Sequence, residues 1–278
     1  MRMPVKLNKN YWPKKLTNFL PSSEDPRKLL TENISSEQFS NAISVFKFGT
    51  TFKTTKSYRF PKTLEVLGSL AFQSPPIVLD VGASDGITSL HAIKCIDFKK
   101  YYITDLNTDV LCERREGKCY FYDVNNNCIL IVTKAFVLYS SSKNSIFPFN
   151  IISDYFFSKS HRTKNAYKKI EIINPEVKKC NKNIEIKKYN LFERWAPGKV
   201  DLIISANILN RCYFSDNQII MAVNNFVSTL NNGGRFVIVE NTDIEKGTIF
   251  QVLNKKIKAE KDINGGIETR ELILNSNR

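Results

Sequence analysis

The chain has 278 residues, of which 42% are hydrophobic and 24% charged, a composition typical of a globular protein that buries a full core. No apolar run reaches the roughly 18 to 20 residues of a membrane-spanning helix. No apolar stretch follows the basic N-terminus as it would in a secretory signal. The sequence therefore predicts a cytoplasmic protein without membrane contact.

The net charge of +14 is compatible with a nucleic-acid partner. The lysines are spread over the whole length, however, and accompany many asparagines and isoleucines, a mixture expected where codon usage favours A and T. Composition therefore leaves nucleic-acid binding open without favouring it. The six cysteines form no C-x-x-C pair and only two histidines accompany them, so the sequence predicts free thiols and no metal site.

The N-terminal segment is basic, polar and punctuated by prolines, which indicates an arm or a loosely packed lead-in. Ser35 and Gln38 form a capping box in front of a helical apolar stripe, and a second helix is predicted to begin at Pro61. We therefore expect a basic arm with a helical lead-in over residues 1–59 and the main domain over residues 60–278.

Strands and helices alternate through the main domain. The predicted strands cover residues 77–81, 101–104, 184–189, 202–205 and 236–239. One helix is predicted from Ile87, and a second follows Ser215 and ends at Gly233-Gly234. Residues 248–253 and 257–261 are expected to pair as a hairpin. This pattern predicts an α/β fold with an open, mostly parallel, Rossmann-like sheet, helices on both faces and a terminal antiparallel hairpin.

Residues 107–183 are too many for a simple crossover between two parallel strands, so they are predicted to be an insertion. CYFYDV and CILIVTKAFVLY flank Asn125-Asn126-Asn127, a pattern typical of a β-hairpin. The insertion is either a lid or substrate-facing subdomain, or a solvated decoration.

The stretch VLDVGASDGITSL, residues 78–90, is compatible with three chemistries. A nucleophile elbow centred on Ser84 would need a histidine late in the chain, and none follows His161. A dinucleotide loop would need a glycine where Ser84 stands and a third glycine beyond Gly86. A loop for S-adenosylmethionine (SAM) needs only an acid at the strand end and glycines around the turn, which Asp80, Gly82 and Gly86 provide.

Asp105 supports the third alternative. It ends the second strand, 19 residues after Gly86. An acid at that distance, at the carboxyl end of the neighbouring strand, can accept hydrogen bonds from both ribose hydroxyls.

On these residues the sequence resembles the class I SAM-dependent methyltransferases over about residues 60 to 262. VLDVGASDG is similar to the family's first motif, YYITDLN to its second, DLIISANILNRCYF to its fourth strand and substrate-facing loop, and NNGGRFVIVEN to the turn into its fifth strand. The resemblance implies a Rossmann-like methyltransferase sheet and SAM as cofactor. It also implies a set of cofactor-binding residues: Asp80, Gly82, Ala83, Ser84, Asp85, Gly86, Asp105, Leu106, Asn190, Leu191 and Asn207.

Two features depart from the family's pattern. Asn190 stands where the family often has an acid that contacts the adenine amino group, although its amide oxygen can also accept a hydrogen bond. The link from Glu240 to Thr248 leaves little room for the family's usual helix.

The acceptor side should lie at the carboxyl edge of the sheet, where alignment of the acceptor with the methyl group is the main task. The candidates for catalytic contacts are Asn207, Asn210, Arg211 and Tyr213 after the fourth strand, with Glu240 and Asn241 after the fifth. ISANILNRCYFSDNQ is similar to the corresponding part of the chemotaxis receptor glutamate methyltransferases, which implies a carboxylate acceptor that Arg211 could hold.

The sequence thus predicts methyl transfer from SAM to a small molecule or to an exposed carboxylate or hydroxyl. Two alternatives stay open. One is an RNA methyltransferase that uses the basic arm and residues 159–188. The other is a methyltransferase-fold protein that binds a partner without turnover.

Overall fold

A computed structural model of the chain describes residues 3–49, 51–53, 59–141, 145–160, 167–180, 183–241 and 243–276. Its contacts divide the chain into two compact units. The parallel-sheet unit comprises Lys56–Thr108 and Glu176–Arg278, and the mixed-sheet unit comprises Met1–Thr55 and Asp109–Pro175.

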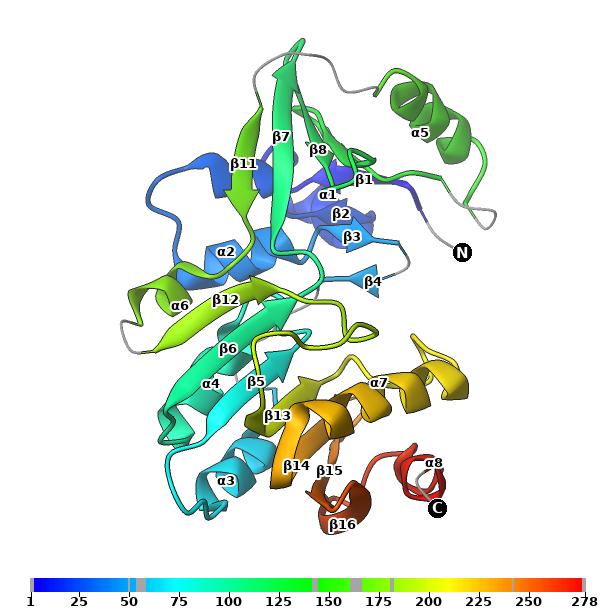
Figure 1. The fold of residues 1–278 in the computed structure, drawn as a ribbon. Coiled ribbons are helices and arrows are strands. Elements are labelled where there is room, and N and C mark those ends of the chain that lie inside the picture. The colour runs from blue at the N-terminus through cyan, green and yellow to red at the C-terminus, as the bar shows by residue number, and fades with distance from the viewer. Residues whose placement is uncertain are drawn as a thin grey trace. The chain divides into compact units, whose positions relative to one another are not determined.

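The parallel-sheet unit is built on seven strands in the order β12-β6-β5-β13-β14-β15-β16 (Figure 1). The strands are β5 (Ile77–Val81), β6 (Lys100–Asp105), β12 (Ile184–Lys188), β13 (Val200–Ala206), β14 (Leu230–Asn241), β15 (Glu245–Leu253) and β16 (Lys256–Ile263). The first five in this spatial order are parallel, and the last two add an antiparallel hairpin. The predicted fold class, including the terminal hairpin, is confirmed.

Five helices accompany this sheet: α3 (Pro61–Ser69), α4 (Ile87–Cys95), α6 (Pro175–Lys179), α7 (Asp216–Thr229) and α8 (Arg270–Asn275). Figure 1 shows α7 on one face of the sheet and α3 and α4 on the other. The capping box of Ser215 and Gln218 starts α7 as its sequence predicts. The helix ends at Thr229 rather than at the glycine pair, because Leu230 already pairs with Val200 in the sheet.

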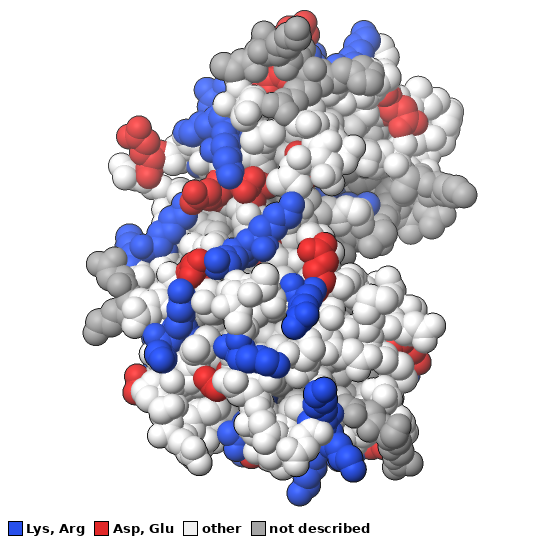
Figure 2. Space-filling view, in the orientation of Figure 1, with Lys and Arg blue, Asp and Glu red and all other residues white. Residues whose placement is uncertain are grey.

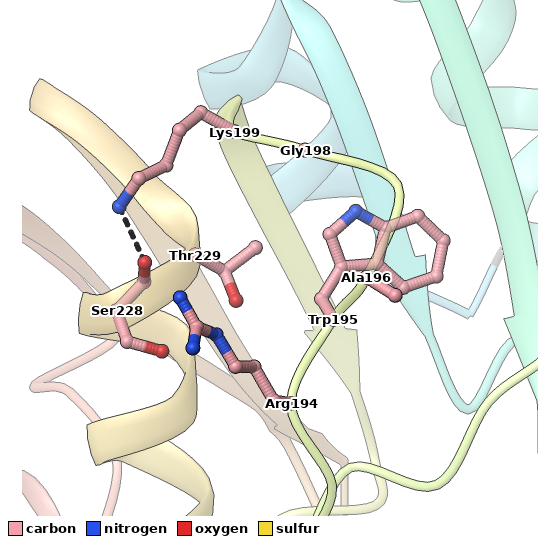
Figure 3. Close-up of a pocket in the computed structure, with 7 residues that line it drawn as sticks. All are labelled: Arg194, Trp195, Ala196, Gly198, Lys199, Ser228 and Thr229. Carbon is pink, nitrogen blue, oxygen red and sulfur yellow. Dashed lines mark hydrogen bonds between the residues drawn. The ribbon is translucent and has the colours of Figure 1, made fainter.

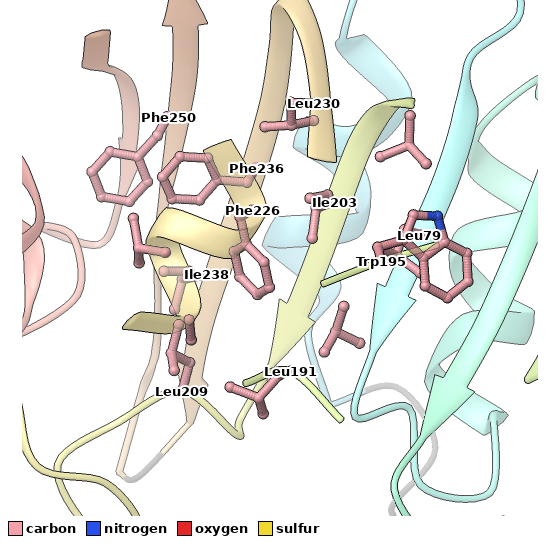
Figure 4. Close-up of a cluster of buried hydrophobic side chains, with 14 of the residues drawn as sticks. Leu79, Leu191, Trp195, Ile203, Leu209, Phe226, Leu230, Phe236, Ile238 and Phe250 are labelled. Atoms are coloured by element: carbon pink, nitrogen blue, oxygen red, sulfur yellow. The ribbon is translucent and has the colours of Figure 1, made fainter. Parts of the chain in front are cut away.

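Aromatic side chains fill the core between α7 and the sheet (Figure 4). The rings of Phe236 and Phe250 stack at 4.7 Å, and Phe226 from α7 meets Phe236 edge-on at 6.1 Å. Trp195 packs edge-on against Tyr102, 5.0 Å away. Because buried aromatic side chains remove large apolar areas from water, this cluster fixes α7 and the loop that contains Trp195 on one face of the sheet.

The mixed-sheet unit contains a second seven-stranded sheet in the order β11-β7-β8-β9-β10-β1-β2. Its strands are β1 (Val5–Asn8), β2 (Ser22–Ser23), β7 (Asp109–Arg115), β8 (Lys118–Tyr122), β9 (Cys128–Val132), β10 (Phe136–Leu138) and β11 (Lys168–Glu171), and β3 (Lys47–Phe48) pairs with β4 (Thr51–Phe52) separately. The helical segments are α1 (Lys14–Phe19), the 3-10 helix η1 (Pro26–Leu30), α2 (Ser36–Ile43) and α5 (Phe149–Ser158).

The predicted hairpin around Asn125-Asn126-Asn127 is present, because β8 and β9 pair antiparallel on either side of the asparagines. Within the insertion, β7 and β11 have no counterpart in the sequence prediction. The N-terminal segment differs from the expected arm, since β1 pairs with β10 and so joins the insertion in one sheet. Residues 1–59 and 107–183 are predicted as separate regions because no local pattern reveals a pairing between strands about 130 residues apart in the chain.

Helix α3 depends on a carboxylate from a distant part of the chain. Its N-cap, Phe60, supplies no side-chain hydrogen bond. Glu245 accepts from the backbone N–H of Lys62 at 3.1 Å and of Thr63 at 2.6 Å, and from the Thr63 hydroxyl at 2.6 Å. The carboxylate thus satisfies the free N–H groups of the second and third helical residues, and it faces the positive end of the helix dipole.

We expect Glu245→Ala to lower the free energy of unfolding by about 2–3 kcal/mol, because the backbone N–H groups of Lys62 and Thr63 and the Thr63 hydroxyl lose a charged acceptor. Glu245→Gln keeps a neutral acceptor and should lose about half as much. Urea unfolding of both variants checks this. Equal stability of the alanine variant and the natural chain would contradict the proposed cap.

Candidate functional site

The strand order of the parallel-sheet unit reverses at β5. From β5 the chain proceeds to β6 and β12 on one side and then crosses to β13 and β14 on the other. In open α/β sheets a ligand binds outside the carboxyl ends of the strands at such a switch point. The loops after β5, β6, β13 and β14 therefore define the candidate active site.

The loop after β5 has a left-handed backbone at three positions. Gly82 has φ +71°, Ser84 +59° and Gly86 +82°. Ala83 donates its backbone N–H to Thr104 O at 2.9 Å, which ties the loop to β6. Asp85 is fully buried and accepts from the N–H of Ile87 at 3.1 Å, so this predicted cofactor residue caps α4. The sequence folds into a tight strand-to-helix turn because glycine adopts positive φ without strain.

Asp105 holds the loop from the end of β6. Its Oδ2 accepts from the Ser84 N–H at 2.9 Å, and its Oδ1 accepts from the Asn107 N–H at 2.8 Å. A carboxylate at this edge is the type of acceptor that ribose hydroxyls require. The structure brings Asp105 and the glycine loop together, as the sequence predicts.

The hydroxyl of Ser84 is buried and has no hydrogen-bond partner among the described residues. A buried polar atom without a partner costs about 1–3 kcal/mol, which a polar ligand can recover. Ser84 on the loop after β5 and Asp105 at the end of β6 thus offer a polar group and an acidic group side by side, a donor and acceptor set that fits the amino-acid and ribose parts of SAM.

Asp80 supports this loop from inside the sheet. It is only 3% exposed, and its Oδ2 accepts from the hydroxyl of Tyr101 at 3.0 Å. Burial raises the pKa of Asp80 to about 6, against the hydrogen bond from Tyr101, and the negative charge of Asp105 adds to the increase. The two acids therefore lie close enough to repel each other, while direct contact of Asp80 with the cofactor stays a prediction.

Tyr101 was not among the predicted site residues. A buried aspartate needs a donor, and Tyr101 lies on the neighbouring strand, so the pairing could have been inferred from the alternation of the two strands.

Three predicted adenine-side residues occupy different environments. Leu106 is half exposed, whereas Leu191 is buried in the core beside α7 (Figure 4). The amide oxygen of Asn190 accepts from the Phe192 N–H at 3.1 Å and its amide nitrogen donates to Glu193 at 3.1 Å. The Asn190 side chain therefore shapes its own turn, and its contact with the adenine amino group stays a prediction.

Asn207 joins the ends of β13 and β14. Its N–H donates to Val239 O at 2.7 Å, and its Oδ1 accepts from the Asn241 N–H at 3.1 Å. The next residue, Ile208, covers the glycine loop, since a Cβ on Gly82 would lie 2.6 Å from Ile208 Cδ1. This contact brings the loop after β13 against the loop after β5, and no local sequence pattern predicts it.

The other predicted catalytic residues follow in the same loop. Asn210 accepts from the Cys212 N–H at 2.9 Å through its Oδ1, and the Tyr213 ring is 39% exposed. Arg211 is held by two carboxylates, donating to Asp216 at 2.8 Å and to Glu268 at 2.7 Å. These hydrogen bonds, first to Asp216 and then to Glu268, raise the pKa of Arg211, and its guanidinium offers no free fork to an acceptor carboxylate.

A cavity of about 370 Å³ lies elsewhere in the unit (Figure 3). It is lined by Arg194, Trp195, Ala196, Gly198, Lys199, Ser228 and Thr229. These residues precede β13 or end α7, so the cavity is at the amino edge of the sheet. Lys199 donates there to the carbonyl oxygen of Leu230 at 3.3 Å. Because the cofactor edge of such a sheet is the opposite one, we do not assign the predicted chemistry to this cavity.

Lys and Arg side chains are spread over the face shown in Figure 2, with Asp and Glu side chains among them. Several lysines are paired, including Lys100 with Glu185 at 2.7 Å and Lys169 with Asp109 at 3.1 Å. Within the described ranges no cluster of three or more His, Cys, Asp or Glu side chains is arranged to hold a metal ion. No helix of the described chain is long and apolar enough to cross a membrane.

The sheet order, the glycine loop at the switch point and the acid at the end of β6 define a Rossmann-like protein of the SAM-dependent methyltransferase class. Residues 110–259 match the family model described as CheR methyltransferase, SAM binding domain. The match covers more than half of the chain, which therefore belongs to the CheR methyltransferase family with SAM as its cofactor. The matched stretch begins after Asp105, so the glycine loop is assigned from its own geometry.

Solved structures of methyltransferases are also similar to this chain, at low sequence identity. An O-methyltransferase family protein from Burkholderia thailandensis is 12% identical, with a TM-score of 0.34, over 64% of this chain and 37% of that one. N-methyltransferase NodS from Bradyrhizobium japonicum WM9, in complex with S-adenosyl-L-homocysteine, is 13% identical, with a TM-score of 0.35, over 66% of this chain and 63% of that one. The chain thus spans less than two thirds of the length of either protein. No curated protein sequence matches the chain.

We expect Gly82→Ala to weaken SAM binding at least about tenfold, because the new methyl group meets Ile208 and a positive φ disfavours alanine. Gly117→Ala is a matched control, since Gly117 also has positive φ but has no atom within 4 Å of its added Cβ. Calorimetric titration with SAM compares them. Equal loss of affinity in both variants would remove the assigned role of the Gly82–Ile208 contact.

We expect Asp80→Asn to stabilise the chain at pH 7.5. The raised pKa means that ionised Asp80 costs folding stability, about 2–3 kcal/mol once the pH exceeds about 6. Below about pH 4 the carboxyl is protonated in the folded and unfolded chain alike, so the advantage of asparagine vanishes there. Urea unfolding at several pH values tests the sign, and a stability difference independent of pH would contradict it.

Proposed function

We propose that the chain transfers the methyl group of SAM to a small molecule or to an exposed carboxylate or hydroxyl by in-line displacement. The proposal rests on the hydrogen bond from the Ser84 N–H to the Asp105 carboxylate at the switch point of the sheet. The Ser84 hydroxyl beside it is buried and has no partner among the described residues. When bound, SAM supplies a sulfonium-activated methyl group.

The residues at the carboxyl edge of the parallel sheet have different roles in this proposal. Gly82 and Gly86 let the turn pack closely against Ile208 and Val177, and Asp105 binds the ribose hydroxyls. Asn207 fixes the loop after β13 through its hydrogen bonds to β14, and Ile208 excludes water from the turn at Gly82. The chain's main contribution is therefore alignment of acceptor and methyl group, with exclusion of water.

The structure favours a small acceptor over RNA. The lysines that would contact a phosphate backbone are in part paired with acids, and the charges of the displayed face are mixed (Figure 2). An RNA-binding surface should be a continuous basic patch. Residues 161–166 and 181–182 of the basic segment 159–188 lie outside the described residues.

We expect Asp105→Ala to lower SAM affinity about 10- to 100-fold, which corresponds to about 1.4–2.8 kcal/mol, because the ribose loses its acceptor and Ser84 loses its clamp. Calorimetric titration of the full chain with SAM measures the change. Asp97→Ala, an exposed acid just before β6, is the control and should bind as the natural chain does.

The same titration separates the alternatives. If neither the natural chain nor the variant binds SAM, the proposed activity fails. If the natural chain binds SAM but transfers no methyl group to any acceptor, the non-catalytic alternative replaces it. Binding of RNA with a steep loss as salt increases would instead support the RNA methyltransferase.

A further inference from the structure

Helix α1 of the mixed-sheet unit leaves three large apolar side chains in contact with water. Leu16, Phe19 and Leu20 are spaced as i, i+3 and i+4, so they share one face of the helix, and Phe19 is 91% exposed. Of the six residues of α1 only Thr17 is buried. Single exposed apolar side chains are common on proteins, whereas a contiguous exposed group marks a surface that contacts something else.

Aromatic side chains beside α1 enlarge this apolar surface. The Tyr11 and Trp12 rings meet edge-on at 5.4 Å, and the Trp12 ring lies 6.2 Å from the ring of Phe136 on β10. Trp12 Nε1 donates to Ala135 O at 2.8 Å, which fixes the Trp12 ring beside β10. We call the surface formed by these exposed or partly exposed side chains the α1 patch: Tyr11, Trp12, Leu16, Phe19, Leu20 and Phe136.

The lysines around the α1 patch are not neutralised by acids. Lys14 and Lys15 are exposed on α1, and the Lys134 ammonium lies over the Tyr11 ring, 5.3 Å from its centroid. No ion pair joins these three lysines to an acid within the described ranges. Residues 1–23 contain no Asp or Glu, and the next residue, Glu24, is held by two other lysines. The patch is therefore positive as well as apolar, which complements an anionic surface.

We propose that the α1 patch binds the chain to the surface of an anionic lipid bilayer. The apolar face of α1 enters the boundary between headgroups and acyl chains, and the lysines meet the lipid phosphates. Tyr11 and Trp12 lie at the level of the headgroups, where rings with a polar end are favoured. This contact is peripheral, so it does not require the long apolar run whose absence led to the expectation of no membrane contact.

The composition of the patch favours a bilayer over RNA. Single-stranded RNA is bound by aromatic rings on which its bases stack, together with cations that meet its phosphates. Leu16 and Leu20 offer no ring to a base, whereas aliphatic side chains on one helix face are typical of interfacial helices. Because α1 is short and buries little area in a bilayer, lysine charge supplies much of the affinity, and salt weakens it.

The first test is sedimentation of the full chain with phosphatidylcholine vesicles that contain about 30% phosphatidylglycerol. We expect binding, at least about tenfold tighter than to phosphatidylcholine alone. Phe19→Ala should weaken binding to the anionic vesicles about tenfold, because most of an inserted apolar side chain is lost. The matched control is Ile151→Ala on α5, which removes another exposed apolar side chain outside the patch and should leave binding unchanged.

The charge contribution is measured with a pair of double variants. Lys14→Gln with Lys15→Gln should weaken binding to the anionic vesicles about 10- to 30-fold, and the difference should shrink as salt is added. Lys256→Gln with Lys258→Gln removes the same charge from two exposed positions on β16 and should bind within about twofold of the natural chain.

The two tryptophans give a readout that does not depend on sedimentation. Trp195 is buried and Trp12 is partly exposed, so quenching of fluorescence by acrylamide reports mainly on Trp12. We expect anionic vesicles to protect Trp12 from acrylamide, and phosphatidylcholine vesicles to protect it much less.

Several outcomes would overturn the inference. These are no binding to the anionic vesicles, or equal binding by Phe19→Ala and Ile151→Ala. Binding of poly(U) RNA or of polyglutamate that Phe19→Ala abolishes, without binding to vesicles, would assign the patch to RNA or to an acidic protein instead. A concentration-dependent dimer lost in Phe19→Ala, again without binding to vesicles, would assign it to a second copy of the chain.

Discussion

The hydrogen bond from the Ser84 N–H to the carboxylate of Asp105 is the interaction on which the candidate site depends. It joins the turn after β5 to the end of β6 and fixes the left-handed backbone of Ser84. A left-handed conformation costs a non-glycine residue about 1–2 kcal/mol, so it persists only where surrounding contacts enforce it. The charge-assisted bond to Asp105 provides that enforcement, and its acceptor is also the residue expected to bind the ribose.

Local signals in the sequence were sufficient for the parallel-sheet unit. The capping box at Ser215, the proline at the start of α3 and the apolar strand runs each specify a structure within a few residues. The alternation of strands and helices then specifies a mostly parallel sheet. The glycine loop and Asp105 meet for the same reason, since parallel neighbours place their carboxyl ends at one edge.

Pairings between distant segments could not be read from the sequence in this way. β1 and β2 carry no signal that selects β10 as their neighbour, and a basic, proline-rich segment is also what a mobile arm would have. β7 was missed because its charged residues conceal its alternation: Glu113 is buried and accepts from the Tyr122 hydroxyl at 3.2 Å. In the site, the Asp216 and Glu268 partners of Arg211 depend on where α8 packs, which no local pattern specifies.

Buried oxygens without a partner in the described chain lie along the carboxyl edge of the parallel sheet. Ser84 Oγ follows β5, Ser205 Oγ lies near the end of β13 and Glu240 Oε1 lies near the end of β14. The same edge is held firmly by other hydrogen bonds. Folding alone does not favour such an arrangement, because a smaller or apolar side chain would avoid the cost. A bound cofactor would recover that cost at Ser84. The protein then loses stability at the carboxyl edge of the sheet, because the chemistry requires polar groups there that only a bound ligand satisfies.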